Sequence, residues 1–307
     1  MTETGSTTYP ENGQNIDDVD RILHDQTVFD VVSEEDKAYQ KLRGLCTAIL
    51  DPEVRVEFRL DFDKTLTTWD SPNTWQAAYL ELSDTPLAGD SPSLREESYL
   101  DRTECMRLQK AGRLDGDAMD AWTLRELQRH VRNNTTEAAL EKRTIEGIEF
   151  RKGVDRFFDL TSSLDIEPLI ASAGLGNVVQ TALKACGIEI PRENIISNWF
   201  NIDGADNEMI VNSRNKRAHI DRLRPITDDR VRYAAVFGDS VDDSRMTDGG
   251  ISIRPHGPKP NDEAYIDESR KACFDVVLRH DTLYGLITFL TKLLDVAQER
   301  RKAPMFR

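Results

Sequence analysis

The run from Val54 to Thr67 constrains the fold of this chain more than any other stretch. Its first part, Val54-Arg55-Val56-Glu57, alternates β-branched and charged residues in the manner of a β-strand. The strand then runs into Asp61-x-Asp63-x-Thr65, so two carboxylates fall at its carboxyl end. Open α/β sheets bind ligands at the carboxyl ends of their strands. The run therefore predicts an α/β fold with an acidic site at one edge of the sheet.

Three interpretations of the Asp61-x-Asp63 pair compete. A calcium loop of the EF-hand kind needs Gly at its sixth position and Glu at its twelfth, where this chain has Leu66 and Pro72, so that interpretation fails. A polar turn without function is the second, because Asp is a common turn residue. The third is phosphoryl transfer, with Asp61 as nucleophile and Asp63 as general acid. This stretch alone leaves the last two open.

Polar residues also follow other strand-like runs. Ser172 comes at the end of Glu167–Ala171 and begins a Gly-rich turn, where a hydroxyl and backbone N–H groups can hold a phosphoryl oxygen. The apolar run Tyr233–Phe237 is typical of a strand covered on both faces, and it leads into Gly238-Asp239-Ser240-x-x-Asp243. Lys216 lies in the polar run 212–217, where a lysine is usually a solvated surface charge.

In this order along the chain, the Asp61, Ser172, Lys216 and Asp239 stretches resemble the four motifs of the haloacid dehalogenase (HAD) superfamily. The resemblance extends from about residue 55 to the C-terminus. It implies a Rossmann-like core with a parallel sheet and a helical C1-type cap inserted after the first motif. We accordingly expect a flexible polar arm over 1–33, a core domain over 34–68 and 151–307, and the cap over 69–150.

The resemblance also assigns roles to these residues. Asp61 would form an aspartyl-phosphate, and Asp63 would protonate the leaving oxygen and then activate water. The second aspartate favours phosphoryl transfer over dehalogenation, because a halide needs no proton. Ser172, the backbone of Ala173 and Lys216 would bind the phosphoryl group, with Arg214 and Arg217 as possible substitutes for the lysine. Thr65 and Asp243 would support the site.

A divalent cation is expected among these carboxylates. Two like charges 4 Å apart repel by roughly 4 kcal/mol at an effective dielectric constant of 20. Mg²⁺ suits such a site because it binds a few carboxylates together with water and substrate phosphate oxygens. The resemblance implies that Asp61, Asp239 and the backbone carbonyl of Asp63 are its ligands.

A narrower resemblance concerns the substrate. The runs Ile170–Val178, Ile196–Asn198 and Gly238–Gly249 are similar to the cytosolic pyrimidine 5′-nucleotidase (type III) branch, which implies a nucleoside 5′-monophosphate as substrate. That branch presents an aromatic and an acidic side chain of the cap to the base. Trp122 is the aromatic candidate, although it is equally a candidate core anchor. The acidic candidates are Glu96, Glu97 and Asp120. A phosphatase of another small metabolite, such as phosphoserine, and a catalytically silent phosphate-binding relative are the alternatives.

The composition of the chain limits the classes of molecule that we expect it to bind. The chain has 307 residues and a formal net charge of −15 at pH 7, which argues against a nucleic-acid polymer as partner because such binding needs a basic surface. The four cysteines are far apart and form no Cys-x-x-Cys pair. No signal peptide or membrane-spanning apolar segment is visible, so we expect a cytoplasmic protein without a membrane partner. The sequence leaves the oligomeric state open.

Overall fold

The protein is represented by a computed structural model that describes residues 19–23, 28–31, 33–68, 93–133, 135–201, 204–205, 210–223, 231–247, 249–255, 263–279 and 283–302. The strands are β1 (Phe29–Val31), β2 (Val54–Leu60), β3 (Glu167–Leu175), β4 (Ile195–Asn198), β5 (Phe200–Asn201), β6 (Gly204–Ala205), β7 (Val231–Phe237), β8 (Ile251–Arg254) and β9 (Val276–Leu278). The helices are α2 (Glu35–Leu50), α4 (Leu94–Lys110), α5 (Gly116–Arg132), α6 (Glu137–Gly147), α7 (Val154–Ser163), α8 (Gly176–Ala185), α9 (Lys216–Leu223), α10 (Val241–Ser244), α11 (Glu263–Lys271) and α12 (Tyr284–Lys302).

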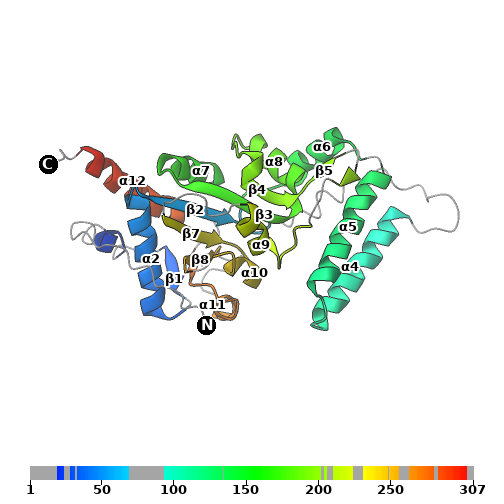
Figure 1. Ribbon diagram of the computed structural model, residues 1–307, viewed down its shortest axis with the longest axis horizontal. Helices are drawn as coiled ribbons and strands as arrows, with labels where there is room; N and C mark the ends of the chain where they lie inside the picture. Colours follow the sequence, from blue (N-terminus) through cyan, green and yellow to red (C-terminus); the bar gives the residue numbers. More distant parts are fainter. Residues whose placement is uncertain are drawn as a thin grey trace.

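Seven of the strands form one sheet in the order β1-β9-β8-β7-β2-β3-β4 (Figure 1). All neighbouring strands in it are parallel except β1, which runs antiparallel to β9. The central strand β2 lies between β7 and β3, and its last residue, Leu60, pairs with Phe237 on one side and Ile170 on the other. The three strands therefore end at the same edge of the sheet, which confirms the predicted α/β fold class.

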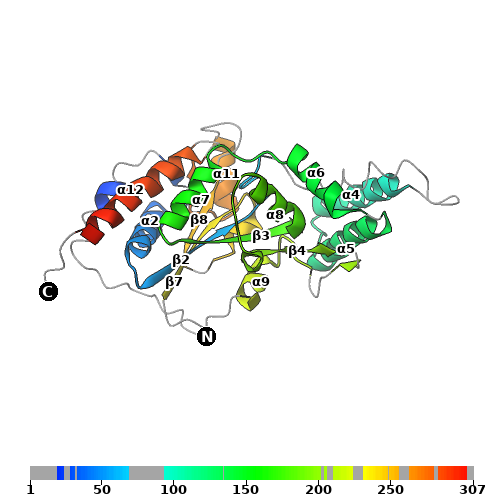
Figure 2. The same cartoon turned by 90° about the horizontal axis from the view of Figure 1, so that it is seen from above.

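Helices cover both faces of this sheet. Because side chains alternate along a strand, Ile170 of β3 packs into the large core beneath α2, α7 and α12, whereas Leu169 and Ala171 pack into a smaller cluster with Ile220 of α9. Figure 2 shows α2, α7 and α12 together on one side of the sheet and α9 on the other. None of the helices in the described ranges is long and apolar enough to cross a bilayer.

The predicted flexible arm over residues 1–33 is wrong for the described part of that range. Val19, Ile22 and Phe29 are buried in the large core, and Phe29 stacks edge-on against Phe289 of α12. Strand β1 extends the sheet by pairing with β9. Few apolar residues in a polar stretch are enough for this, because the edge of the sheet supplies the hydrogen-bond partners. Residues 1–18 lie outside the described residues.

Helices α4, α5 and α6 come between β2 and β3 in the chain, and α4 and α5 lie side by side away from the sheet (Figure 1). Ion pairs join these two helices. Arg129 of α5, only 2% exposed, binds Glu126 of the same helix at 2.7 Å and also pairs with Asp101 of α4. A buried guanidinium of this kind is tolerated when carboxylates surround it.

The chain enters and leaves this helical segment at adjacent points. Thr67 forms an antiparallel bridge with Phe150, and the Thr68 N–H donates to the Glu149 carbonyl at 2.9 Å. Leu127 of α5 and Leu140 of α6 pack against Leu175 and Val178 beside the sheet. These contacts support the proposed division into a core domain and a cap over 69–150; residues 69–92 lie outside the described residues.

Candidate active site

Asp61 is the first residue beyond β2 and is 4% exposed. Its backbone N–H donates to the Phe237 carbonyl at 2.8 Å, which fixes it at the end of the sheet. Its carboxylate accepts two side-chain hydrogen bonds, from Lys216 Nζ at 2.5 Å to Oδ1 and from Thr65 Oγ1 at 3.0 Å to Oδ2. The side chain that the sequence predicts as the nucleophile is thus held at both oxygens.

Lys216 begins α9 and is 4% exposed, so it is not a solvated surface lysine. Its ammonium bridges Asp61 and Asp243, with a distance of 2.7 Å to Asp243 Oδ1. The other carboxylate oxygen of Asp243 accepts hydrogen bonds from the N–H and hydroxyl of Ser240, at 3.0 and 2.6 Å. Of the three basic candidates, Arg214 is exposed and Arg217 pairs with Asp221 on its own helix. The structure therefore brings Lys216, not its neighbours, to Asp61.

Asp239 completes an acidic group. Carboxylate oxygens of Asp61, Asp239 and Asp243 all lie within 4.8 Å of one another. Asp63 lies in the turn that follows Asp61; its side chain is half-buried and is not among these three. Gly238 is required by this packing, because a Cβ at that position would lie 2.1 Å from the Cβ of Asp243.

The charges in this group are unbalanced. Burial raises the pKa of Asp61 well above its usual range, and the charges of Asp243 and Asp239 raise it further against the opposing attraction of Lys216. Burial opposes the charge of Lys216, but the carboxylates of Asp243 and Asp61 raise its pKa above the usual range, so it stays an ammonium ion. With all three carboxylates ionised, the single ammonium would leave two formal negative charges among the buried Asp61 and Asp243 and the half-buried Asp239. A divalent cation with oxygen ligands fits that donor set.

Ser172 and Ala173 lie within β3, in the part of the strand that continues past the end of β2. Ile170 pairs with Leu60, the last residue of β2, and the register of β3 with β4 shifts between Ala171 and Leu175. The fully buried Ser172 Oγ accepts a hydrogen bond from the Gly174 N–H at 3.0 Å.

The predicted Gly-rich turn after Ser172 is wrong, because β3 continues to Leu175 and runs directly into α8. The N-terminal N–H groups of α8 favour an anion. Ser172 and Ala173 nevertheless lie at the same edge of the sheet as the acidic group.

Asn198, at the end of β4, was not predicted as a site residue. Its Nδ2 donates to the carbonyls of Ala173 and Val211, both at 2.8 Å, and its Oδ1 accepts from the Val211 N–H at 2.8 Å. Ser197 supports the same part of β3 by donating to the Gly174 carbonyl at 2.8 Å. Asn198 therefore connects the end of β3, next to Ser172, to the segment that leads to Lys216.

We expect Asn198→Ala to lower the free energy of unfolding by about 2–4 kcal/mol, because it leaves three buried backbone groups without partners. Asn198→Asp is the matched variant, since it keeps the acceptor for the Val211 N–H but loses both donated bonds. Urea denaturation of the three proteins measures the difference. Equal stability of Asn198→Ala and the unsubstituted protein would contradict this account of the side chain.

Two arginines outside the motifs hold the backbone of the site. Arg151, just beyond the cap, donates to the carbonyls of Thr65 at 3.0 Å and Lys64 at 2.6 Å, in the turn where Lys64 has a left-handed φ of 58°. Arg254, buried against the ring of Tyr265, donates to the Asp239 carbonyl at 3.1 Å. No sequence motif identifies either arginine, because each one binds backbone atoms of a segment that is distant in the chain.

The four cap residues considered as possible ligands of the base, Glu96, Glu97, Asp120 and Trp122, have different contacts in the structure. Glu96 caps α4 through Ser93, and Glu97 pairs with Arg132 of α5. Asp120 of α5 reaches the core domain, where its Oδ1 accepts from Asn212 Nδ2 at 2.6 Å. Trp122 is half-buried, and within the described part of the chain its indole N–H is buried and has no acceptor. Among the described residues, no hydrogen bond joins the Trp122 indole to the acidic group.

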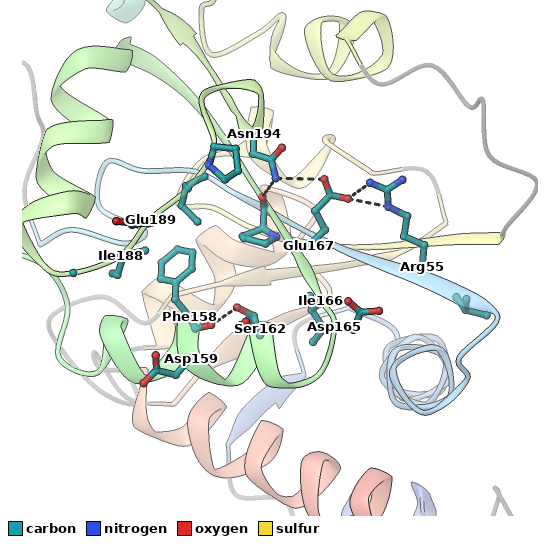
Figure 3. Close-up of a pocket in the computed structure, with 16 residues that line it drawn as sticks. Arg55, Phe158, Asp159, Ser162, Asp165, Ile166, Glu167, Ile188, Glu189 and Asn194 are labelled. Atoms are coloured by element: carbon teal, nitrogen blue, oxygen red, sulfur yellow. Dashed lines mark hydrogen bonds and ion pairs between the residues drawn. The ribbon is translucent and has the colours of Figure 1, made fainter. Parts of the chain in front are cut away.

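A hollow of about 620 Å³ opens at the opposite edge of the sheet, near the amino ends of β2 and β3 (Figure 3). There Glu167 is satisfied within the protein, by Arg55 Nε at 2.8 Å and by Asn194 Nδ2 at 3.3 Å, as the dashed lines in Figure 3 show. Ligands of open α/β sheets bind at the carboxyl ends of the strands. We therefore place the candidate site at the acidic group and not in this hollow.

Comparison with known proteins assigns the family. A family model described as pyrimidine 5′-nucleotidase (UMPH-1) matches residues 119–287, more than half of the chain. The chain belongs to this family. The match covers Ser172, Lys216, Asp239 and Asp243, and it confirms the resemblance seen in the sequence and the predicted enzyme class, a phosphatase.

Solved structures agree with the fold. The chain is similar to cytosolic 5′-nucleotidase IIIB, whose crystal structure contains cytidine, with a TM-score of 0.59 and 18% identity over 93% of this chain and 98% of that one. It is also similar to a protein of unknown function from Bordetella pertussis Tohama I, with a TM-score of 0.52 and 16% identity over 73% and 98% of the two chains. At these identities the likeness shows a shared fold.

Proposed function

We propose that the protein is a magnesium-dependent phosphomonoesterase that acts through an aspartyl-phosphate on Asp61, with a nucleoside 5′-monophosphate as substrate. The observation that carries this proposal is the bridge from the Lys216 ammonium to Asp61 and Asp243, with Asp239 beside it. A structural ion pair would need one carboxylate for one lysine. Two carboxylates on one ammonium, with a third carboxylate beside them, are instead suited to bind a cation and a phosphoryl group.

The residues present fit magnesium. Its ligands would be the carboxylates of Asp61 and Asp239 and the backbone carbonyl of Asp63, all hard oxygen donors. When bound, the ion supplies positive charge to the oxygens of the transferring phosphoryl group. Asp243 is engaged by Lys216 and Ser240, so we assign it to holding the lysine in place.

In the first step, an oxygen of Asp61 attacks phosphorus while the bond from phosphorus to the ester oxygen breaks. Asp63, protonated at this stage, gives its proton to the leaving oxygen, so a neutral alcohol departs. The Lys216 ammonium, 2.5 Å from Asp61 in the resting site, offsets the negative charge brought by the phosphate. Thr65 holds the second oxygen of Asp61 and so orients the attack.

In the second step, Asp63 is a carboxylate and takes a proton from water as the water oxygen attacks the phosphorus of the aspartyl-phosphate. The bond between Asp61 and phosphorus breaks, inorganic phosphate leaves, and Asp61 and protonated Asp63 are restored. Throughout both steps, the Ser172 hydroxyl and the N–H groups at the start of α8 would bind phosphoryl oxygens. The half-buried position of Asp63 leaves it open to the leaving group and to water.

The choice of substrate rests on family membership and on the cap. A pyrimidine nucleoside 5′-monophosphate is the substrate class that the family description names. We assign Trp122, a half-buried residue of α5 in the cap, to binding the base. Trp122→Phe should then raise KM for the nucleotide while leaving turnover of p-nitrophenyl phosphate unchanged.

Phosphate release from a panel of esters tests the proposal. We expect turnover of pyrimidine nucleoside 5′-monophosphates with Mg²⁺, loss of activity in EDTA and recovery when Mg²⁺ is added in excess. Hydrolysis of phosphoserine or another ester, with every nucleotide inert, would replace the nucleotidase assignment. A purified protein inactive on all esters, including p-nitrophenyl phosphate, would indicate a catalytically silent phosphate-binding relative.

A further inference from the structure

One side chain of the cap touches the segment that carries Lys216. Asp120 lies in the second turn of α5, and its Oδ1 accepts a hydrogen bond of 2.6 Å from Nδ2 of Asn212. Asn212 is 2% exposed, so this bond is shielded from water on the core side. The neighbouring residues also meet, because the Ser213 hydroxyl lies 3.8 Å from the Met119 sulfur.

The rest of the Asn212 side chain builds the turn before α9. Its Oδ1 accepts from the backbone N–H of Arg214 at 2.8 Å and of Asn215 at 3.1 Å. The Asn212 N–H in turn donates to Asn215 Oδ1 at 2.8 Å. The two polar atoms of the Asn212 carboxamide thus have different partners. Its oxygen orders the turn, and its nitrogen binds Asp120 of the cap.

Lys216 is the first helical residue after this turn, and its Nζ reaches Asp61 and Asp243. A shift of the turn therefore moves the base of the lysine side chain relative to the nucleophile. Hydrogen bonds therefore connect Asp120 in the cap to Asn212, and Asn212 to the backbone N–H groups of Arg214 and Asn215. Lys216 follows Asn215 directly in the chain, so the restrained turn sets the position of its backbone.

We propose that Asp120 is a positioning residue, which couples the seating of the cap to the placement of the Lys216 ammonium beside Asp61. The proposal rests on the proposed phosphatase function. With the cap seated, the Asp120 carboxylate holds Nδ2 of Asn212 and restrains the turn. With the cap displaced, that buried donor loses its partner, which costs free energy and favours the seated arrangement.

This role differs from reading the nucleobase, the other role open to an acidic residue of the cap. A base reader changes KM for nucleotides and leaves esters without a base unaffected. A residue that positions Lys216 acts on the phosphoryl step, so its loss lowers kcat for p-nitrophenyl phosphate as well. The two roles therefore predict different results with a substrate that has no base.

Exchanging the two side chains provides the test. Asn212→Asp keeps the oxygen that orders the turn but sets a second carboxylate against Asp120, and we expect kcat for p-nitrophenyl phosphate to fall by about 10-fold or more. Asp120→Asn still offers an oxygen to Asn212 and should stay within about 3-fold of the unsubstituted enzyme. In the double variant the new carboxamide can donate to the new carboxylate, so kcat should recover. Asp117→Asn, an exposed aspartate in the first turn of α5, is the matched control.

Amide hydrogen exchange gives a readout that does not depend on activity. Exchange at residues 213–216 should accelerate in Asn212→Asp and in Asp120→Ala, and return to its original rate in the double variant. Unchanged exchange and kcat in both Asn212→Asp and Asp120→Ala would overturn the proposal. So would a double variant, Asp120→Asn with Asn212→Asp, that fails to recover. If the unsubstituted protein hydrolyses no ester, the proposed function fails, and exchange alone still decides whether Asp120 restrains the turn.

Discussion

Replacing Asp61 by asparagine is expected to reduce kcat by about 10⁴-fold or more, because the carboxamide cannot form the aspartyl-phosphate and nucleophile removal has effects of this size. The fold should survive the change. Asparagine has the same shape, and it removes one negative charge from a group in which burial and Asp243 already raise the pKa of Asp61. We therefore expect the metal-free variant to be at least as stable as the unsubstituted protein in urea denaturation.

Asp242→Asn is the matched control for this prediction. Asp242 lies next to Asp243 but outside the acidic group, and it faces Arg245 at 3.7 Å. Phosphate release by this variant should stay close to that of the unsubstituted enzyme. Substantial turnover by Asp61→Asn would show that another group attacks phosphorus. A large loss of stability in Asp61→Asn would show that the carboxylate is held for structure and not for catalysis.

Replacing Lys216 by methionine is expected to have the largest combined effect. It removes the ammonium between Asp61 and Asp243 and leaves buried carboxylates uncompensated, a change that costs roughly 3–5 kcal/mol of folding free energy. Activity should fall by about 10³-fold, because the phosphoryl group loses a cation placed to stabilise its charge. Urea denaturation and phosphate release, both measured with and without Mg²⁺, separate the two effects.

Arg217→Met, at the next position of α9, is the control. Arg217 forms an exposed pair with Asp221 one turn along the helix, and such pairs contribute only about 0.3–0.5 kcal/mol. Adding Asp243→Asn to Lys216→Met should recover part of the lost stability, because it removes one uncompensated charge. If Lys216→Met folds as stably as Arg217→Met, the lysine is not the charge that holds this group together.

The core of the site could be predicted from the sequence because its residues lie near the carboxyl ends of strands. Asp61 and Asp239 come just after a strand, and Ser172 lies in β3 just past the point where β2 ends, so all three lie at the carboxyl edge of the sheet. The role of Lys216 was harder to predict from the sequence, because the polar run around it is typical of a solvent-exposed segment. Its burial results from the packing of α9 on the sheet, which no local pattern reveals.

The residues that support the site from other segments could not be predicted from the sequence, and the reason is physical. Asn198 and Arg151 act on backbone carbonyls of segments distant in the chain, and backbone carbonyls are the same at every position. The contact of Asp120 with Asn212 depends on how the cap sits on the core. The N-terminal segment was misjudged because Val19, Ile22 and Phe29 are too few to form a periodic pattern, although the core buries all three.

Chemical trapping of the intermediate tests the central claim most directly. The enzyme is mixed with substrate and Mg²⁺ for a single turnover, quenched, and reduced with borohydride, which converts an aspartyl-phosphate into homoserine; mass spectrometry of the peptides then locates the changed residue. We expect homoserine at position 61 in the active enzyme and none in Asp61→Asn. Phosphate release with Asp61 unmodified, or with the label on another aspartate, would contradict the account.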